Sequence, residues 1–215
     1  AVGELGLDGS VQGIPGVLAI AAKAKEQQVR CLVVPSANER EARLVEGVCV
    51  CGIKSLGEIF RQLLQGETIG CIKKTDTLFE REVVAGQGDF ADISGQSGMK
   101  RAAEIAVAGR HNLLMVGPPG SGKSMIAKRI PTIFPALTRE ESLRITKVYS
   151  VAGMIKSEQP LVMERPFREV NQTVTKAALL GGGAWPKPGE LTLASGGVLF
   201  LDELAEFKRS VLEVL

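Results

Sequence analysis

Residues Gly117–Ser124 read GPPGSGKS, and this stretch decides how the second half of the chain folds. It matches the pattern G-x-x-x-x-G-K-[ST] of a phosphate-binding loop. It lies between Asn112–Val116, whose apolar residues predict a strand, and Ser124–Ile130, which predicts a helix. The glycines let successive backbone N–H groups turn towards phosphate oxygens, and the partial positive charge at the helix start adds to that attraction. The stretch therefore predicts a nucleotide site in an α/β domain.

The residues of this loop have distinct expected parts in binding ATP. Lys123 is expected to reach the β- and γ-phosphates, which makes it a catalytic residue as well as a binding one, and the Ser124 hydroxyl is expected to bind Mg²⁺. A glycine loop without a ligand is the alternative, and the strand–loop–helix context disfavours it. The other predicted nucleotide contacts of this stretch are Gly117, Pro118, Pro119, Gly120, Ser121, Gly122 and Met125.

A second signal lies in Gly196–Glu203, which reads GGVLFLDE. A fully apolar run that ends in two acids is typical of a central strand in a parallel sheet. Asp202 is expected to hold the Mg²⁺ through water, and Glu203 to orient or deprotonate the attacking water. An acidic pair after a strand is a weak signal alone. Together with the phosphate loop it indicates ATP hydrolysis, because a protein that only holds nucleotide has no use for Glu203.

The composition bounds the class of protein. Of 215 residues, 45% are apolar and 4% are aromatic, which predicts an aliphatic core, and the net charge of +2 is too small to indicate nucleic-acid binding by itself. No apolar run reaches the roughly 18 residues of a membrane span, so we expect no membrane partner. Because there is one histidine and no CxxC, we expect no zinc site but reduced, buried thiols in a cytoplasmic protein, at Cys31, Cys49, Cys51 and Cys71.

The pattern of apolar residues predicts two α/β domains. Residues 1–66 alternate strand and helix patterns, with a helix expected over 36–47 that Ser36 or Asn38 would cap. Residues 67–88 have weak periodicity and end in Gly-Gln-Gly, which predicts a linker before a second domain over 89–215. The chain starts without Met and stops inside an amphipathic pattern without a cap, so we expect a fragment of a longer protein.

Three stretches together resemble one family: DFADISGQ (89–96), GPPGSGKS and GGGAWPKPGELTLASGGVLFLDELAEF (181–207). They look like the magnesium-chelatase-like AAA+ ATPases of the YifB/ComM group, and the resemblance covers essentially the whole chain. It implies a P-loop AAA+ parallel-sheet core and a hexameric ring motor with ATP at subunit interfaces. It places Asp92 and Ile93 near the adenine. ComM-type proteins are associated with DNA uptake and branch migration, so the resemblance implies DNA as a partner.

This sequence departs from the family pattern after RPFR (165–168), where the group usually has two histidines. Asn171 and Gln172 occupy that place here, so amides must take over whatever the histidines do. The single histidine, His111, precedes the nucleotide strand, and we expect it to be structural or on the surface. The sensor residues, arginine finger and helical lid of AAA+ proteins would follow residue 215. The fragment is therefore expected to hydrolyse ATP poorly.

The first module is similar to the proteolytic domain of Lon proteases, a ribosomal-S5-like fold, through GELGLDGSVQGIPGVLAIAAKAKE and CLVVPSANEREARLVEG. The resemblance puts Leu18 opposite the catalytic lysine of Lon, and leucine cannot act as a base. Lys23 and Lys25 lie more than a helical turn further on. We therefore expect a partial, degenerate and non-proteolytic domain with a role in assembly or regulation of the ring.

A glycine-rich loop, residues 181–190, offers the candidate substrate contacts. An aromatic such as Trp185 beside a cation such as Lys187 can stack on a base and touch a phosphate. In the alternative, Trp185 packs beneath a hairpin whose shape the prolines fix.

The favoured function is an ATP-driven motor that acts on DNA. The alternative is a magnesium-chelatase-type motor that remodels a partner protein, and the Lon-like module argues against it. An ATP-dependent protease is disfavoured by Leu18, and a nucleotide-gated binding module is disfavoured by Glu203.

Overall fold

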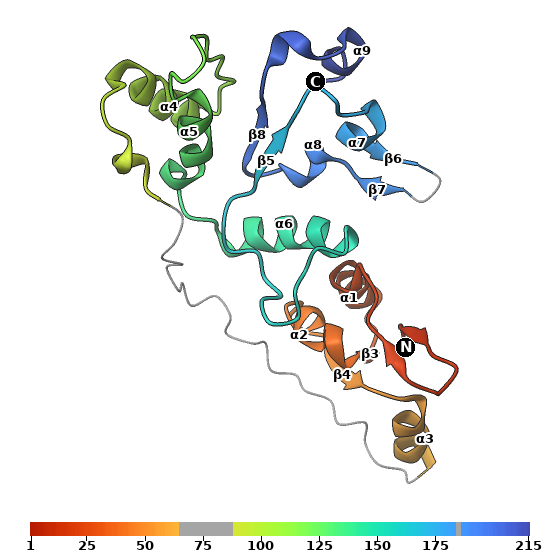
Figure 1. Ribbon diagram of the computed structural model, residues 1–215. Coiled ribbons are helices and arrows are strands. Elements are labelled where there is room, and N and C mark those ends of the chain that lie inside the picture. Colours follow the sequence, from red (N-terminus) through yellow and green to blue (C-terminus); the bar gives the residue numbers. More distant parts are fainter. Residues whose placement is uncertain (65–87, 184–185) are drawn as a thin grey trace. The chain divides into compact units, whose positions relative to one another are not determined.

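The structure is a computed structural model that describes residues 1–64, 88–183 and 186–215 (Figure 1). The described residues form two compact units, which are treated separately below. Residues 1–64 and 139–163 make the first unit, and the other described residues make the second. Apart from Gly88, the predicted linker lies outside the described residues.

The first unit is built on two parallel strands, β3 (Cys31–Pro35) and β4 (Cys49–Ile53), paired from Cys31↔Cys49 to Pro35↔Ile53. A short antiparallel pair precedes them, and helices connect and follow the strands. These elements are β1 (Glu4–Leu5), β2 (Val11–Gln12), α1 (Val17–Glu26), η1 (Ser36–Asn38), α2 (Glu39–Ala42), α3 (Leu56–Leu64) and α6 (Arg139–Val151).

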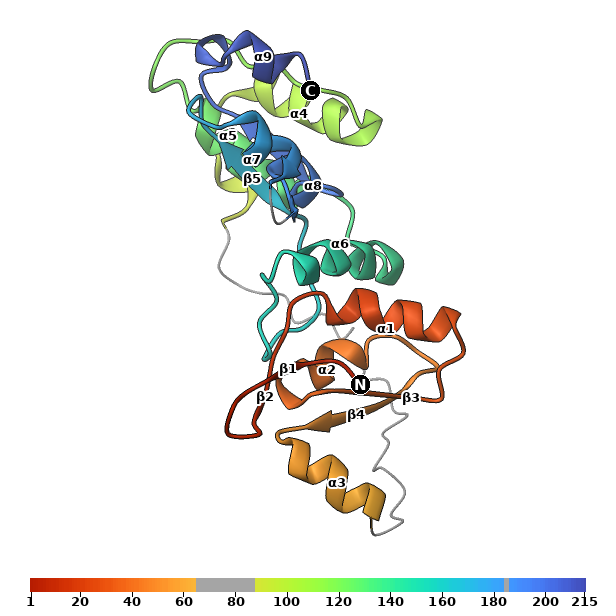
Figure 2. The ribbon, with the colours of Figure 1, turned by 90° about the vertical axis from the view of Figure 1, so that its right-hand side faces the viewer.

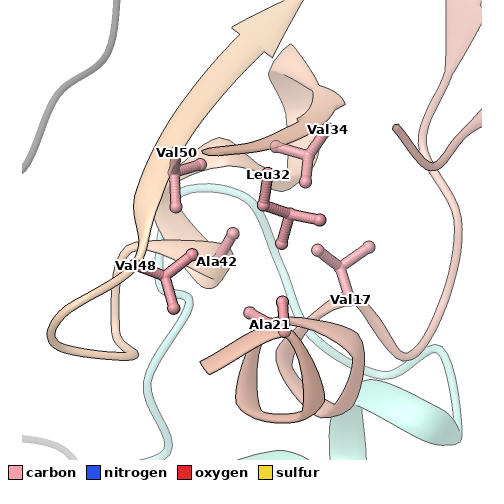
Figure 3. Packing of buried hydrophobic residues seen from close by; sticks show 8 residues of the cluster. Val17, Ala21, Leu32, Val34, Ala42, Val48 and Val50 are labelled. Atoms are coloured by element: carbon pink, nitrogen blue, oxygen red, sulfur yellow. The ribbon is translucent and has the colours of Figure 1, made fainter. Parts of the chain in front are cut away.

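The core of the first unit is aliphatic, as the composition predicts. Figure 3 shows Val17 and Ala21 of α1 facing the strands, with Val34 and Val50 on the strand side. Small and β-branched side chains let the helix lie close to the sheet. The buried members of this cluster are Val17, Ala21, Ala24, Leu32, Val34, Ala42, Val48 and Val50.

The helix predicted over 36–47 is reduced to η1 and the single turn of α2. Two polar side chains of this stretch bond to the segment that leads into α1 and to the first turn of that helix. Asn38 accepts a hydrogen bond from Ile14 N and donates to Ile14 O, both at 3.0 Å, and Glu41 Oε1 accepts from Leu18 N at 3.2 Å. Gly16, the residue before α1, has no side chain that could cap that helix, so buried Glu41 serves as its cap from a different element.

Residues 139–163 interrupt the second half of the sequence but pack in the first unit, although the sequence pattern placed them in the second domain. Figures 1 and 2 both show α6 alongside α1. Ser142, Thr146 and Ser150 repeat every four residues on α6 and are fully buried, so the helix presents a narrow, small-residue face. Thr146 Oγ1 donates to Ser142 O and accepts from Val162 N, which satisfies these polar groups within the unit.

The second unit contains a parallel strand pair, β5 (Phe167–Val170) and β8 (Val198–Leu201), and an antiparallel pair, β6 (Gly181–Gly182) and β7 (Lys187–Pro188). Short helical turns join the strands. The helices are η2 (Phe90–Asp92), α4 (Ser97–Gly109), α5 (Lys123–Arg129), η3 (Ile130–Ile133), α7 (Lys176–Leu180), α8 (Glu190–Leu193), η4 (Leu204–Glu206) and α9 (Arg209–Leu212).

The predicted parallel sheet is therefore present as one strand pair among the described residues. Residues 112–116, predicted as the strand before the phosphate loop, form no strand, and Leu114 and Val116 are 71% and 84% exposed. No described strand pairs with this segment, so its backbone groups lack a ladder partner. The mixed α/β class is confirmed, but the prediction of a strand at 112–116 is wrong for this structure.

Two apolar clusters hold the second unit together. One joins η2, α4, α5 and η3 through Phe90, Ile93, Ala103, Ile126 and Ile130, with Val198 of β8 packed against it. The other consists of Val170, Leu179, Phe207 and Val211. Both clusters are made mostly of aliphatic side chains, in keeping with the low aromatic content.

The oxidation state of the cysteines differs in part from the prediction. Cys49 is disulfide-bonded, so the prediction of four reduced thiols is wrong for this residue, whereas Cys31 and Cys51 take part in no disulfide. Burial raises the pKa of the Cys51 thiol, with a smaller effect from Cys31 and nearby carboxylates. Within the described residues, no three His, Cys, Asp or Glu side chains gather as a metal site, and no helix has the length and apolarity of a membrane span.

Replacing Glu41 by Ala should destabilise the first unit. The substitution leaves the buried Leu18 N–H without its acceptor, which costs about 1–3 kcal/mol in the free energy of unfolding. Urea unfolding followed by circular dichroism measures that loss, and hydrogen exchange of the Leu18 amide should become faster. Glu26→Ala, which removes only an exposed pair with Lys23, is the control and should leave both unchanged. A Glu41→Ala protein as stable as the parent would contradict the capping role.

Adjacent leucines of α7 give a matched test of the second unit. Leu179 is fully buried, and Leu179→Ala should lower the free energy of unfolding by about 2–5 kcal/mol because it leaves a cavity. Leu180 is 39% exposed, and Leu180→Ala should change the free energy of unfolding by less than about 1 kcal/mol. Thermal or urea unfolding of the two variants decides the matter. Equal losses would show that α7 is not packed as described.

Candidate nucleotide-binding site

The phosphate loop turns sharply into α5. Gly120 and Gly122 have φ of 76° and 84°, in the left-handed region that glycine adopts without strain. Gly122 lies immediately before α5, and Lys123 is the first residue of the helix. The predicted loop and helix are therefore both present, and the loop itself is largely exposed.

Lys123 folds back over the loop from which it emerges. Its Nζ donates to the carbonyl oxygens of Gly117 and Pro118, each at 2.9 Å, and to Ser121 Oγ at 3.3 Å. The ammonium group thus donates to three neutral oxygens of its own loop. Phosphate oxygens carry negative charge and are stronger acceptors, so a phosphate that binds here can replace these oxygens as the hydrogen-bond acceptor of the ammonium group.

Next to Lys123, the start of α5 contributes further predicted contacts. Ser124 lies in the first turn of α5 and is partly buried, while the Met125 side chain is 50% exposed. Pro119 lies in the exposed part of the loop. A hydroxyl in this place is a suitable ligand for Mg²⁺, and an exposed apolar side chain beside it is free to cover a base or ribose.

Gln96 is a loop contact that the sequence analysis missed. Its Nε2 donates to Ser121 O at 3.4 Å, and its backbone has φ of 54°, a left-handed value that is unusual outside glycine. Gln96 precedes α4 and ends the DFADISGQ stretch. The resemblance of that stretch to the family predicts nucleotide contacts for Asp92 and Ile93, and it could also have pointed to Gln96.

Asp92 and Ile93, the predicted adenine neighbours, have structural partners here. Asp92 Oδ2 accepts from Asp89 N at 2.6 Å, which completes a capping box around η2. Ile93 is 3% exposed and packs in the cluster that contains Ile126 of α5. The segment is therefore held against the phosphate-loop helix, and a contact of these residues with adenine stays a prediction.

The acidic pair follows β8 as the sequence predicted. Asp202 N donates to Val170 O at 3.2 Å, which extends the contact with β5 by one residue, and Asp202 Oδ1 accepts from Glu203 N at 3.1 Å. Glu203 is exposed and has φ of 54°. A left-handed conformation costs a residue with a side chain about 1 kcal/mol or more, and such strain gathers at functional sites.

The loop and the acidic pair belong to one packed arrangement. Ile126 of α5 and Val198 of β8 share a cluster, and Lys128 Nζ of α5 pairs with Glu169 Oε2 of β5 at 3.0 Å. In Figure 1, α5 starts and β8 ends at the same side of the second unit. The donor set of Lys123, the Ser124 hydroxyl and the Asp202 carboxylate fits Mg²⁺-ATP in chemical type, because it offers a cation for phosphate and oxygens for a hard metal.

The candidate substrate loop has a well-anchored base. A Cβ on Gly189 would lie 2.2 Å from Gly181 N, so only glycine lets the two ends of the β6–β7 hairpin approach. Arg168 binds both carboxylate oxygens of Glu190, at 2.6 and 2.8 Å, beside that base. Lys187 lies exposed in β7, and Trp185 lies outside the described residues.

Of the two amides that stand where the family usually has histidines, Asn171 bonds to a residue close by in the chain. Asn171 Oδ1 accepts from Thr173 N at 3.2 Å and from Thr173 Oγ1 at 2.6 Å, which closes a turn after β5. Gln172 is partly buried, and His111 is exposed, in keeping with its expected surface role.

Leu18 is the residue that the resemblance to Lon sets opposite a catalytic lysine. Leu18 is 3% exposed and packs with Leu44 and Leu161. Lys23 is exposed and pairs with Glu26 at 2.9 Å, so it points away from that core. The side chain at the position that the resemblance assigns to a catalytic lysine is therefore apolar and packs among leucines.

Comparison with known proteins identifies the family. Residues 89–215 match the family described as magnesium chelatase, subunit ChlI, and residues 1–38 match a family described as subunit ChlI of Mg-chelatase. Because the second match lies in the first module, that module does not argue against a chelatase-type motor, contrary to the expectation from sequence.

Relatives align along the whole of this chain. It is 42% identical over 217 residues to the uncharacterized protein Rv2897c of Mycobacterium tuberculosis, and 40% identical over 215 residues to the uncharacterized protein YifB of Escherichia coli. It is 38% identical over 221 residues to the competence protein ComM of Haemophilus influenzae. The chain spans only 41–42% of the length of these relatives. With the first family match covering more than half of the chain, the chain belongs to the magnesium chelatase subunit ChlI family, in the group that contains YifB and ComM.

Proposed function

We propose that the chain binds and hydrolyses ATP as part of a ring-shaped motor. The ChlI family belongs to the AAA+ P-loop ATPases, which supports an ATPase in general terms. The observation that carries the proposal is the placement of the Lys123 ammonium among the carbonyls of its own loop. Such a cation is ready to exchange neutral acceptors for phosphate oxygens.

The residues of the site divide the chemistry among them. The loop N–H groups and Lys123 hold the β- and γ-phosphates, and Ser124 and Asp202 hold the Mg²⁺ that these phosphates bring. Mg²⁺ neutralises charge that develops on the phosphate oxygens. Glu203 orients or deprotonates the attacking water, a role that its strained backbone and exposed carboxylate support.

DNA is the proposed substrate of the motor. The relative from Haemophilus influenzae is named a competence protein, which supports a role with DNA. The exposed Lys187 on the anchored β6–β7 hairpin is a candidate phosphate contact, with Trp185 as a candidate stacking residue. The second candidate function is a chelatase-type motor that remodels a partner protein, and both family matches favour it.

The remaining proposals concern the whole protein. We infer a hexameric ring with ATP at subunit interfaces and a cytoplasmic location. We also infer a Lon-like first module without proteolytic activity, because Leu18 is buried among leucines. Casein or peptide cleavage by the full-length protein would contradict this last proposal.

Lys123→Ala should abolish tight ATP binding, because the loop loses the cation that faces the phosphates. Titration of the full-length protein with a fluorescent ATP analogue measures the change, and we expect affinity to fall at least a hundredfold, equivalent to about 2.7 kcal/mol. Lys128→Ala is the matched control on the same helix, since Lys128 pairs with Glu169 and faces no predicted phosphate. Equal affinity in the Lys123 variant and the parent would refute the site.

Glu203→Gln should keep ATP binding and stop turnover. The amide fills the same space but is a very poor base, so the hydrolysis rate should fall by about 10² or more while nucleotide affinity stays within a few fold. Steady-state phosphate release and equilibrium binding measure the two effects. Glu206→Gln, exposed one turn later, should behave as the parent does. Normal hydrolysis by the Glu203 variant would show that another group activates the water.

DNA should stimulate the ATPase of the full-length protein, and salt should weaken the stimulation because phosphate contacts release counterions. The rate is measured with single-stranded and branched DNA between 50 and 200 mM salt, a range over which phosphate-mediated binding falls by roughly 10³ or more for six or more contacts. A robust rate that no DNA alters would instead favour the chelatase-type motor and a protein partner.

A further inference from the structure

Arg165 lies just before β5 and reaches two other segments of the second unit. Its Nε donates to Pro135 O and its Nη1 donates to Gly196 O, both at 2.8 Å. Its guanidinium carbon lies 5.2 Å from the centroid of the Phe134 ring. A planar guanidinium has fixed N–H directions on separate nitrogens, so it binds two carbonyls in a defined geometry while its face lies over the ring, whereas a lysine ammonium donates from one atom.

The two segments that Arg165 joins lead directly to the predicted nucleotide residues. The phosphate-loop arm, residues 123–135, runs from Lys123 through α5 and η3 to Phe134 and Pro135. The acidic arm, residues 196–203, runs from Gly196 through β8 to Asp202 and Glu203. Arg165 contacts each arm at the end opposite to its reactive residues.

Both arms run from the Arg165 contacts to the predicted nucleotide residues. The phosphate-loop arm consists of η3 and α5, and the acidic arm consists of the turn at Gly196 and the strand β8. A fixed point at the base of both arms limits how far the arms can shift along each other, and therefore the position of Lys123 relative to the acidic pair.

The other contacts that the phosphate-loop arm makes with β8 and with the neighbouring strand β5 constrain this relative position less. Ile126 and Ile130 pack in the cluster with Val198, and Lys128 pairs with Glu169 through side chains that are 48% and 42% exposed. Apolar packing has no direction, and an exposed ion pair is weak and adaptable. The bonds of Arg165 are directional and end on backbone carbonyls, so they fix position as well as proximity.

The acidic arm is also fixed tightly to the segment that carries Arg165. Val198 N donates to Pro166 O at 2.8 Å, and a Cβ on Gly197 would lie only 2.0 Å from that oxygen. The backbone at Arg165 and the first residues of the acidic arm are therefore held together. The side chain of Arg165 connects this fixed region to the phosphate-loop arm through its bond to Pro135 O.

We propose that Arg165 is a positioning residue that sets the register of the phosphate-loop arm against the acidic arm. It acts on hydrolysis through Lys123 and Glu203 and touches no reacting atom. This inference rests on the proposed ATPase function, and it predicts that loss of Arg165 impairs turnover more than nucleotide binding. Binding needs the loop alone, whereas in-line attack needs the loop and the acidic pair at the correct separation.

The test compares Arg165→Lys and Arg165→Ala with the parent in the full-length protein. We expect both variants to bind a fluorescent ATP analogue within threefold of the parent affinity and at full stoichiometry, with turnover at saturating ATP reduced at least tenfold. Millimolar guanidinium should restore part of the turnover of Arg165→Ala by filling the vacated place. Arg209→Ala is the control, because Arg209 is 92% exposed and pairs with Glu213, four residues further along the chain. ATP turnover by this variant should equal that of the parent, and guanidinium should not increase it.

Two results would overturn the proposal. One is turnover within twofold of the parent in both variants. The other is loss of active binding sites in proportion to turnover, with a matching fall in melting temperature, which would make Arg165 purely structural. If the parent itself bound no ATP, the proposed function would fail separately. Hydrogen exchange of the Ile126 amide in nucleotide-free protein would then decide on Arg165, since the inference predicts faster exchange in both variants and unchanged exchange would refute it.

Discussion

The close contact between Gly197 and Pro166 is the constraint on which the site depends. Pro166 O accepts from Val198 N and leaves no room for a side chain at Gly197, so the start of β8 lies directly against the start of β5. The register that follows, from Phe167↔Val198 to Val170↔Leu201, brings the strand to its end at Asp202. A shift by one residue would turn every side chain of β8 to the opposite face and move the acidic pair with it.

Four residues of the candidate site have left-handed backbone conformations. Gly120 and Gly122 adopt them freely, as a loop whose N–H groups must converge requires. Gln96 and Glu203 adopt them at a cost, and they are two of the four non-glycine residues with positive φ in the described part of the chain. Glycine would relieve that cost at either position. The side chains found there are the Gln96 amide, which bonds to the loop, and the Glu203 carboxylate, which follows Asp202 in the chain.

The sequence predicted the parts of this structure that local chemistry determines. The phosphate loop, α5 and the β8 strand with its acidic end follow from glycine spacing, apolar runs and helix patterns over a few residues. The failures all depend on distant partners. Residues 112–116 have the composition of a strand but no described strand to pair with. Residues 36–47 have helical spacing, but Asn38 and Glu41 bond to the approach to α1. Arg165 was unremarkable in sequence because its carbonyl partners lie 30 and 31 residues away.

Residues 139–163 pack in the first unit, although the chain on both sides of them belongs to the second. This segment follows the phosphate-loop arm and precedes β5, yet it is held in the first unit by buried hydroxyls on α6, by Leu161 and by the Arg139–Glu46 pair. The chain therefore leaves the second unit after residue 138 and returns at 164, one residue before Arg165. Side chains that bond and pack within the first unit therefore decide where this insertion lies, and its neighbours along the chain do not.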